Sequence, residues 1–415
     1  MKHPLSLWVT VLALLLMPMA QARDGRVWHV SQSTGSNGND GSREHPLKNI
    51  QAAIDLASPG DEIRVAEGNY YGLSDAGNIR IDKGVSIVGG YAADFSERDV
   101  LRHRTFVQPT AASNASAQGQ GTVQINVRQE DALVELDGLI MDRGNSVAYN
   151  PRGEGRPEGV ETPMMQPVGS AGVGAPGVSD PQVYTTETAI VYIQTGSKSH
   201  VAIRNCAFLN GPNYGLLGAT YAAEVTVDNC IFVNIRMAAV ELRGSAASAN
   251  SRTHVTNSTI LFVWSRLKDL GDMGYGYRYL PRMDSFLRGN ILGCCVLAAL
   301  DGTRTDGTGP ADAQPRVNTC ENTLFFRNRA ADLLLPGENG GRRVRVEDFG
   351  RLPQVDRLSG NRAVSDPAVF GGAVDEAYLK GFLDPDTQMF ANHYPVEEAL
   401  RLFGAVPGYG AQIPK

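Results

Sequence analysis

A tract of positively charged and phenolic side chains occupies residues 264–283. Guanidinium groups bind carboxylates through paired hydrogen bonds, and aromatic rings offer flat faces that stack on sugar rings. This mixture suits an acidic polysaccharide. We interpret the tract as an inserted loop, because long loops on a rigid framework commonly carry binding residues. Its candidate residues are Lys268, Tyr275, Tyr277, Arg278, Tyr279 and Arg282.

A second set of candidates lies on short β-rich runs. Successive side chains of a strand point to opposite faces, so Glu241 and Arg243 face outwards if Val240 and Leu242 are buried. The same alternation makes Tyr192 and Gln194 project, and it places Asp301 at a strand end with Arg304 just beyond. The strands we expect cover residues 189–194, 214–219, 238–243 and 296–301.

The elements that position these residues repeat along the chain. A β-rich run, an asparagine and a second apolar run recur every 24 to 33 residues, at Asn205, Asn229, Asn257, Asn290 and Asn322. Such a period fits coils of three short strands, stacked about 4.8 Å apart. Asparagine tolerates a left-handed turn, and its amide can bond to the amide of the next coil. We therefore predict an all-β, right-handed parallel β-helix with an asparagine ladder.

The same repeat predicts the interior of the coils. Phe208 and Phe232 follow successive ladder asparagines by three residues, so we expect them to stack inside the helix. Cys206 and Cys230 would stack as well, either as a disulfide or as two buried reduced thiols. The total of five cysteines is odd, so at least one thiol is unpaired in a monomer, which is the state we expect.

The ends of the chain read differently from its middle. Residues 1–22 have the charge, apolar run and small-residue cleavage pattern of a signal peptide, which predicts export to the periplasm or outside the cell and no transmembrane segment in the mature chain. Residues 23–345 form the predicted β-helix, with a helix at 46–57 capping its first coil. Residues 147–186 form a long loop rich in glycine and proline. Residues 346–415 form a C-terminal capping extension with helices near 375–382 and 395–403.

The charge of the chain limits its partners. The formal net charge is −6, whereas a nucleic-acid-binding protein usually shows a basic balance. We therefore expect no nucleic acid as a partner.

Several motifs resemble the first coil of the pectate-lyase-like β-helix superfamily. They are GNDGS at 38–42, PLKNIQAAI at 46–54, ASPGD at 57–61, IRV at 63–65, GNY at 68–70 and GVSIVGGY at 84–91. With the ladder, the resemblance spans roughly residues 27–340. It implies the fold but leaves the chemistry open, because this fold carries many activities. The signatures of polygalacturonase-like hydrolases, mannuronan epimerases and pectin methylesterases are missing. Among the enzymes of this superfamily, the resemblance therefore favours a polysaccharide lyase.

A lyase would act on a uronate by β-elimination, which needs a neutralised carboxylate and a base. The candidates for these catalytic roles are Arg243, Lys268, Tyr277, Arg278 and Arg282. Tyr192, Gln194, Tyr275, Tyr279 and Arg304 are candidates for substrate binding. Glu241 and Asp301 are candidate ligands for Ca²⁺, which prefers carboxylate oxygens.

Two other functions stay open. One is a non-catalytic protein that presents a long sheet to a glycan or another surface. The other is a periplasmic metal-handling protein that uses Cys294, Cys295 and methionines as soft ligands. Charges that converge on one groove would favour the enzyme, and scattered, solvated charges would favour the binding protein.

Overall fold

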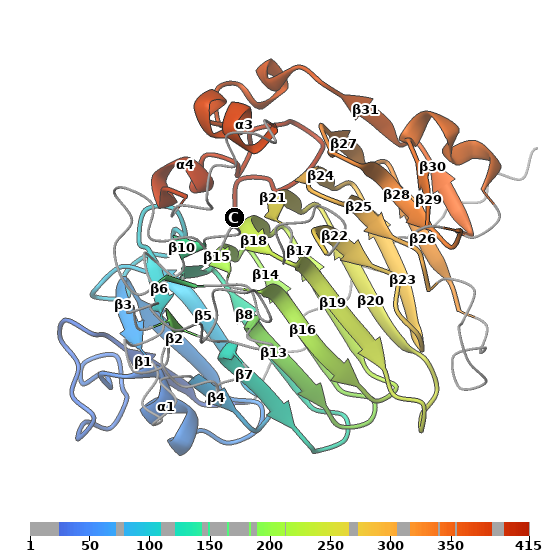
Figure 1. Ribbon diagram of the computed structural model, residues 1–415. Coiled ribbons are helices and arrows are strands. Elements are labelled where there is room, and N and C mark those ends of the chain that lie inside the picture. The colour runs from blue at the N-terminus through green and yellow to red at the C-terminus, as the bar shows by residue number, and fades with distance from the viewer. Residues whose placement is uncertain are drawn as a thin grey trace, which may run out of the picture.

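The chain forms a parallel β-helix with three long sheets, as the computed structural model in Figure 1 shows. This confirms the predicted fold. The described residues are 25–71, 79–108, 121–142, 148–149, 164–165, 182–183, 189–211, 213–264, 273–304, 316–338, 341–352, 355–383 and 394–414.

Each coil contributes one strand to each sheet in a fixed order. We call the three sheets A, B and C. For example, β13 lies in sheet C, β14 in sheet A and β15 in sheet B, and β16 lies in sheet C again. Sheet A contains β1 (Val27–Val30), β2 (Glu62–Ala66), β5 (Ser86–Tyr91), β8 (Leu133–Asp137), β14 (His200–Arg204), β17 (Glu224–Asp228), β20 (Ser251–Thr256), β23 (Met283–Arg288), β26 (Asn318–Glu321) and β30 (Arg357–Ser359).

The other two sheets follow the same stacking. Sheet B contains β3 (Gly68–Tyr71), β6 (Thr105–Gln108), β9 (Leu139–Asp142), β15 (Ala207–Gly211), β18 (Ile231–Arg236), β21 (Thr259–Trp264), β24 (Ile291–Cys295), β27 (Leu324–Phe326) and β31 (Arg362–Val364). Sheet C contains β4 (Ile79–Ile81), β7 (Gly121–Val127), β13 (Ala189–Thr195), β16 (Tyr214–Thr220), β19 (Ala238–Gly244), β22 (Tyr275–Arg278), β25 (Ala298–Asp301), β28 (Ala331–Leu335) and β29 (Arg342–Val344). Among the described strands of the three sheets, the pairing of β28 with β29 is the only antiparallel one.

The asparagine ladder is present between Asn205 and Asn229. Asn229 donates from Nδ2 to Oδ1 of Asn205 at 2.7 Å, and both residues have the left-handed backbone that the turn requires, with φ of 55° and 53°. Asn257, by contrast, donates from Nδ2 to Oδ1 of Asp228 at 3.0 Å instead of to Asn229.

For the fourth predicted ladder residue, Asn290, the prediction is wrong by one position, because Gly289 adopts the left-handed turn with φ of 69°. Asn290 instead points inwards and receives a hydrogen bond from the backbone N–H of Ser258 at 2.9 Å. A glycine adopts this conformation more easily than asparagine does.

The predicted interior stack is also confirmed. The rings of Phe208 and Phe232 are parallel within 10°, with centroids 4.3 Å apart, and both side chains are fully buried. All five cysteines lie among the described residues, and each is buried and unpaired. Cys206 and Cys230 therefore fit the second alternative, that of two buried thiols. Burial raises the pKa of the Cys230 thiol well above its usual value.

The two ends of the solenoid are closed by different elements. Helix α1 (Ile50–Leu56) covers the first coil with Ile50, Ala53 and Ile54, as predicted. At the other end, the short helix η2 (Val346–Arg351) places Phe349 in the same core cluster. The coils continue past the predicted boundary at residue 345, because β30 and β31 still pair in parallel with β26 and β27.

The C-terminal extension covers the side of the β-helix rather than its end. We call residues 365–383 and 394–414 the C-terminal strap. It contains η3 (Pro367–Phe370), α3 (Glu376–Leu383) and α4 (Val396–Leu400), close to the predicted helices. Phe370 packs on Phe326 of β27, whereas Tyr394 donates from its backbone N–H to Asn210 of β15, several coils nearer the N-terminus. The strap therefore runs back along sheet B, as Figure 1 shows.

Two sequence predictions fall mainly on residues outside the described ranges. Residues 1–22, the predicted signal peptide, lie outside them entirely. Within 147–186, the described pairs β10 (Ala148–Tyr149), β11 (Met164–Met165) and β12 (Gln182–Val183) form a small parallel sheet. Among the described residues, no helix is long and apolar enough to cross a membrane.

Candidate functional site

The strongest cluster of candidate residues lies on the outer face of sheet C. In-register pairing places Glu241 of β19 beside Leu217 of β16, and Arg278 of β22 beside Asp301 of β25. Because β19 and β22 also pair in parallel, three charged side chains from three successive coils stand next to one another. Val240 and Leu242 face the core, as the alternation predicted.

Arg278 is clamped between two carboxylates. Its Nη1 donates to Oε2 of Glu241 at 2.7 Å, and its Nε donates to Oδ2 of Asp301 at 2.7 Å. The exposed fractions of the side chains are 15% for Arg278, 7% for Glu241 and 1% for Asp301. The guanidinium also lies 4.8 Å from the ring centre of Tyr275. Burial by itself lowers the pKa of Arg278, but the charges of Asp301 and Glu241 outweigh burial and raise that pKa.

Further arginines surround this clamp and line a hollow of about 430 Å³. We call this hollow the arginine groove. Arg243 is 61% exposed, with Nη2 3.9 Å from Oε1 of Glu241, and Arg304 is exposed at the end of the following coil. The described residues that line the groove with charged or aromatic side chains are Tyr221, Glu241, Arg243, Arg278, Arg282 and Arg304. The predicted candidates Arg243, Arg278, Arg282, Arg304 and Glu241 thus meet in one place.

A tight backbone contact fixes one wall of the arginine groove. A Cβ on Gly244 would lie 1.9 Å from the carbonyl oxygen of Arg282, so only glycine fits there. Nη2 of Arg282 donates to the carbonyls of Ala246 at 2.7 Å and Ser248 at 2.9 Å. This side chain is therefore held against the turn that follows β19, and it contributes fixed positive charge to the wall.

Tyr192 and Gln194 lie on the same face, two strands away from the arginine groove. In one row across the strands, Gln194 pairs with Ala219, and Ala219 pairs with Arg243. In a second row, Tyr192 pairs with Leu217, and Leu217 pairs with Glu241. Two strand steps correspond to roughly 10 Å. Gln194 is exposed and Tyr192 is half-buried, so both can contact a ligand that extends beyond the groove.

Tyr277 and Tyr279 are placed where they cannot touch such a ligand. Residues 275–278 form strand β22 rather than part of a loop, so this part of the prediction is wrong. Tyr277 and Tyr279 are fully buried inside the β-helix, where Tyr277 bonds to Oγ of Ser285 at 2.8 Å. Burial raises the pKa of Tyr277 to about 12, which does not suit a base. Lys268 lies outside the described residues.

The two predicted Ca²⁺ ligands are already engaged. Asp301 accepts from Arg278 on Oδ2, and its Oδ1 accepts from the backbone N–H of Thr303 at 3.0 Å and from the Thr303 hydroxyl at 2.7 Å. A cation at this place would have to displace the guanidinium of Arg278, which is hydrogen-bonded to both carboxylates. The donor set therefore does not fit Ca²⁺, and among the described residues no group of three or more His, Cys, Asp or Glu side chains could hold a metal ion.

Tyr221 is the groove residue that sequence reasoning missed. Its side chain is 46% exposed and lies just beyond the end of β16. The signal was available, since Tyr221 follows a predicted outward-facing strand by two residues. An aromatic side chain at that point has no interior position to fill.

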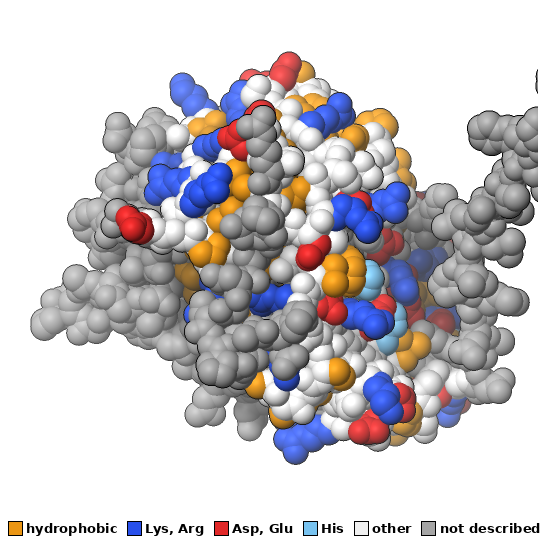
Figure 2. All heavy atoms as spheres, turned by 90° about the vertical axis from the view of Figure 1, so that its right-hand side faces the viewer, with side chains coloured by type: hydrophobic (Ala, Val, Ile, Leu, Met, Phe, Trp, Pro, Cys, Tyr) orange, Lys and Arg blue, Asp and Glu red, His pale blue; other side chains and the backbone are white. Residues whose placement is uncertain are grey.

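The outer face of sheet A has a different character. Across its strands, Glu224 lies beside Arg252, and Arg252 lies beside Asp284, so opposite charges alternate from coil to coil. His254 stacks on Phe286 with ring centroids 4.8 Å apart. Figure 2 shows a similar mixture on the face that it draws, with basic and acidic side chains side by side and histidine among them. Alternating charges stabilise neighbouring strands but create no field of one sign.

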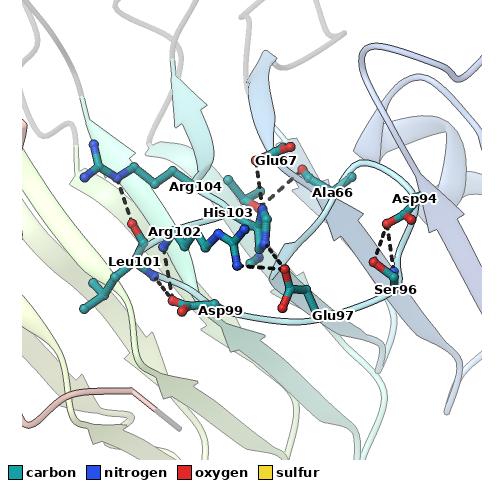
Figure 3. A network of polar contacts seen from close by, with 12 residues as sticks. Ala66, Glu67, Asp94, Ser96, Glu97, Asp99, Leu101, Arg102, His103 and Arg104 are labelled. Carbon is teal, nitrogen blue, oxygen red and sulfur yellow. Dashed lines mark hydrogen bonds and ion pairs between the residues drawn. The ribbon is translucent and has the colours of Figure 1, made fainter.

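A second polar cluster surrounds His103, close to the start of β6. Nδ1 of its ring lies 3.0 Å from Oε2 of Glu67, and Nε2 lies 3.1 Å from Oε1 of Glu97. Figure 3 shows the two carboxylates at different edges of the ring, with Arg102 also on Glu97. The hydrogen bond to Glu67 is the largest cause that raises the pKa of His103. Because both ring nitrogens are hydrogen-bonded to carboxylates, we interpret this cluster as a structural contact that stabilises the adjacent turns.

Comparisons with known proteins give a family model of unknown function and several distant solved structures. A family model described as "Protein of unknown function (DUF1565)" matches residues 33–150. No curated protein matches the chain at a significant level. Among solved structures, pectate lyase Pel9A is similar at 12% identity and a TM-score of 0.40, covering 82% of this chain and 77% of that one.

Two further solved structures are similar in the same way. A structure named rhamnogalacturonan lyase has 11% identity and a TM-score of 0.34, covering 93% of this chain and 100% of that one. A GH136 lacto-N-biosidase from Eubacterium ramulus has 10% identity and a TM-score of 0.33, covering 83% of this chain and 67% of that one. The sheet topology itself shows that the chain is a parallel β-helix.

Proposed function

We propose that this protein binds an acidic, uronate-containing polysaccharide in the arginine groove and cleaves it there by β-elimination. The observation that carries the proposal is the convergence of Arg243, Arg278, Arg282 and Arg304 on one hollow of about 430 Å³. Arginine binds carboxylates in a planar, two-point geometry that lysine cannot reproduce. The clamp on Arg278 holds its guanidinium in place before any ligand arrives.

The groove provides the charge that β-elimination needs. In this reaction a base removes the proton at C5 of the uronate, and the C–H electron pair becomes the C4=C5 double bond. The C4–O bond breaks at the same time, and the leaving oxygen takes up a proton. Guanidinium groups around the carboxylate stabilise the negative charge that develops next to C5.

Three described side chains on the rim of the groove are exposed enough to approach C5, namely Tyr221, Arg243 and Arg304. A guanidinium keeps its proton in proteins, so Arg243 and Arg304 are suited to holding the carboxylate. Tyr221, when deprotonated, could accept the C5 proton and return a proton to the leaving oxygen. We therefore expect Tyr221→Phe to lower kcat more than it raises KM, and Arg243→Gln to weaken binding.

A non-catalytic binding protein is the second candidate. The observation that favours it is that Glu241, the carboxylate lining the described part of the groove, is paired with Arg278 and not free to act as a base. In that case the groove would hold an acidic glycan without changing it. Export, and location in the periplasm or outside the cell, remain part of the proposal in both cases.

The test is to incubate purified protein with alginate, pectate and glycosaminoglycans, with and without Ca²⁺. Unsaturated uronates absorb in the ultraviolet, so a rising absorbance supports cleavage. Binding to the same polymers is measured in parallel by affinity electrophoresis. Binding with a flat absorbance trace supports the second candidate and overturns the lyase. Failure to bind any polymer overturns the whole proposal.

A further inference from the structure

A second hollow lies on sheet C, at its N-terminal end. It measures about 680 Å³ and is bordered by α1 and by strands β4 and β7. Its polar lining includes Gln124 and Asn126 on β7 and Gln129 just beyond that strand. Asn126 and Gln129 are exposed and Gln124 is half-buried. We call this hollow the amide pocket.

The capping helix is fixed as one wall of the amide pocket. Oε1 of Gln51 on α1 accepts from the backbone N–H of Arg80 at 2.8 Å, and its Nε2 donates to the carbonyl of Arg80 at 3.1 Å. Gln51 thus closes the open edge of β4 with a pair of bonds of the kind that another strand would make. The pocket is therefore built on two anchored elements of the fold.

Strand register connects the amide pocket to the arginine groove. Asn126 pairs with Gln194, Gln194 pairs with Ala219, and Ala219 pairs with Arg243, so these residues lie in one row across four neighbouring strands. Figure 1 shows β7, β13, β16 and β19 following one another along the solenoid. Three strand steps amount to about 14 Å. A polymer of several sugars that lies along this face therefore meets both hollows.

The two hollows differ in charge. In the amide pocket, Arg80 and Arg128 are balanced by Asp55 and Asp82. In the arginine groove, four arginines outnumber Glu241 and Asp301, the two carboxylates that clamp Arg278, so the local charge stays positive. The attraction for anions is therefore concentrated at one end of the face.

The chemistry of the two linings follows the same division. Side-chain amides both donate and accept hydrogen bonds, whereas an ionised carboxylate only accepts. Sugar hydroxyls and acetamido groups also do both, so they match the amide pocket. A carboxylate placed there would lose water without a net positive charge to compensate it, because Asp55 and Asp82 offset Arg80 and Arg128. Uncompensated charge is a common means of rejecting a wrong ligand.

We propose, as a refinement that rests on the proposed function, that the ligand is a heteropolysaccharide in which neutral sugars separate the uronates. The neutral sugars occupy the amide pocket while a uronate occupies the arginine groove. An uninterrupted polyuronate is the poorer ligand, because it brings carboxylates to both ends of the face.

The test compares two acidic oligosaccharides with the same number of sugars by isothermal titration. One is hyaluronan, which alternates glucuronate with N-acetylglucosamine, and the other is polygalacturonate. The variants are the double substitution Gln124→Ala with Asn126→Ala, which changes the amide pocket, and Arg243→Ala, which changes the arginine groove. Arg252→Ala, an exposed arginine on sheet A, is the control.

The expected result is tighter binding of hyaluronan than of polygalacturonate. The amide double variant weakens hyaluronan binding about tenfold, or roughly 1.4 kcal/mol, and leaves polygalacturonate within about twofold. Arg243→Ala weakens both. Equal or tighter binding of polygalacturonate overturns the inference alone, as does an amide variant that weakens both ligands equally. If neither oligosaccharide binds, the proposed function falls and this inference falls with it.

Discussion

Replacing the buried guanidinium of Arg278 is the sharpest test of how the arginine groove is built. Arg278→Met keeps most of the side-chain volume but leaves two carboxylates without their partner. Those carboxylates are 7% exposed in Glu241 and 1% exposed in Asp301. Removing one partner of a buried ion pair destabilises a protein by about 3–5 kcal/mol, because a charge is left uncompensated.

The pH dependence of this variant has a definite sign. Without the guanidinium, burial penalises the ionised form of two carboxylates that have lost their counter-charge. The penalty is largest at neutral pH, where folding must hold both groups ionised or take up protons. It shrinks as the pH falls, because protonation removes the uncompensated charges. We expect a smaller loss at pH 5 than at pH 7.5.

The assay is urea unfolding of the wild type, Arg278→Met, and the triple variant that adds Glu241→Gln and Asp301→Asn. The triple variant removes the unpaired charges and recovers more than half of the loss. An exposed pair contributes about 0–1 kcal/mol. A loss below about 1 kcal/mol for Arg278→Met, or no recovery in the triple variant, would refute the buried clamp.

Three further substitutions test the framework. Phe232→Ala removes one ring of the interior stack and lowers the free energy of unfolding by about 3–5 kcal/mol; a loss under about 1 kcal/mol in urea unfolding would show that the ring is not in a packed core. Asn229→Ala removes the hydrogen bond to Asn205 and places an alanine at a φ of 55°, where asparagine is tolerated better. The free energy of unfolding should fall by about 1–3 kcal/mol, and an unchanged midpoint of thermal unfolding would contradict the ladder. His103 has a raised pKa through Glu67, so its contribution to stability is complete below about pH 6.5 and is lost as the pH rises through the folded-state pKa. The difference in unfolding temperature between wild type and His103→Gln should therefore shrink from pH 6 to pH 9, and a constant difference would contradict that assignment.

The strand pattern was visible in the sequence wherever one face of a strand is buried. Val240 and Leu242 alternate with Glu241 and Arg243, and this period-two pattern located the outer face of sheet C correctly. The ladder was visible for a similar reason, because Asn205 and Asn229 stand in the same turn of successive coils. At Gly289 the turn residue changes type, and the pattern alone led to the neighbouring Asn290.

Strand β22 was misread because its composition looks like that of a loop. Tyr275 and Tyr277 are separated by Gly276, and the surrounding glycines and arginines suggested an exposed insertion. In the structure a Cβ on Gly276 would lie 2.6 Å from the carbonyl oxygen of Ala299, so this glycine permits close packing of strands. The hydroxyl of Tyr277 donates to Oγ of Ser285 inside the core, and this hydrogen bond allows the polar ring to be buried.

The clamp on Arg278 could not be predicted from the sequence. Glu241 is 37 residues away and Asp301 is 23 residues away, and only the register of three coils brings them together. The position of the strap was missed despite a signal. Strands such as β18 and β21 are apolar on both faces, which indicates a sheet covered on both sides.

The most direct test of the central claim is the binding of acidic polysaccharide to matched arginine variants. Affinity electrophoresis in gels containing hyaluronan or pectate would compare the wild type with Arg243→Gln and with Arg252→Gln. Both substitutions remove one exposed positive charge, but only the first lies in the arginine groove. We predict that Arg243→Gln lowers affinity at least tenfold while Arg252→Gln binds like the wild type. Equal effects of the two substitutions, or no binding by the wild type, would contradict the claim.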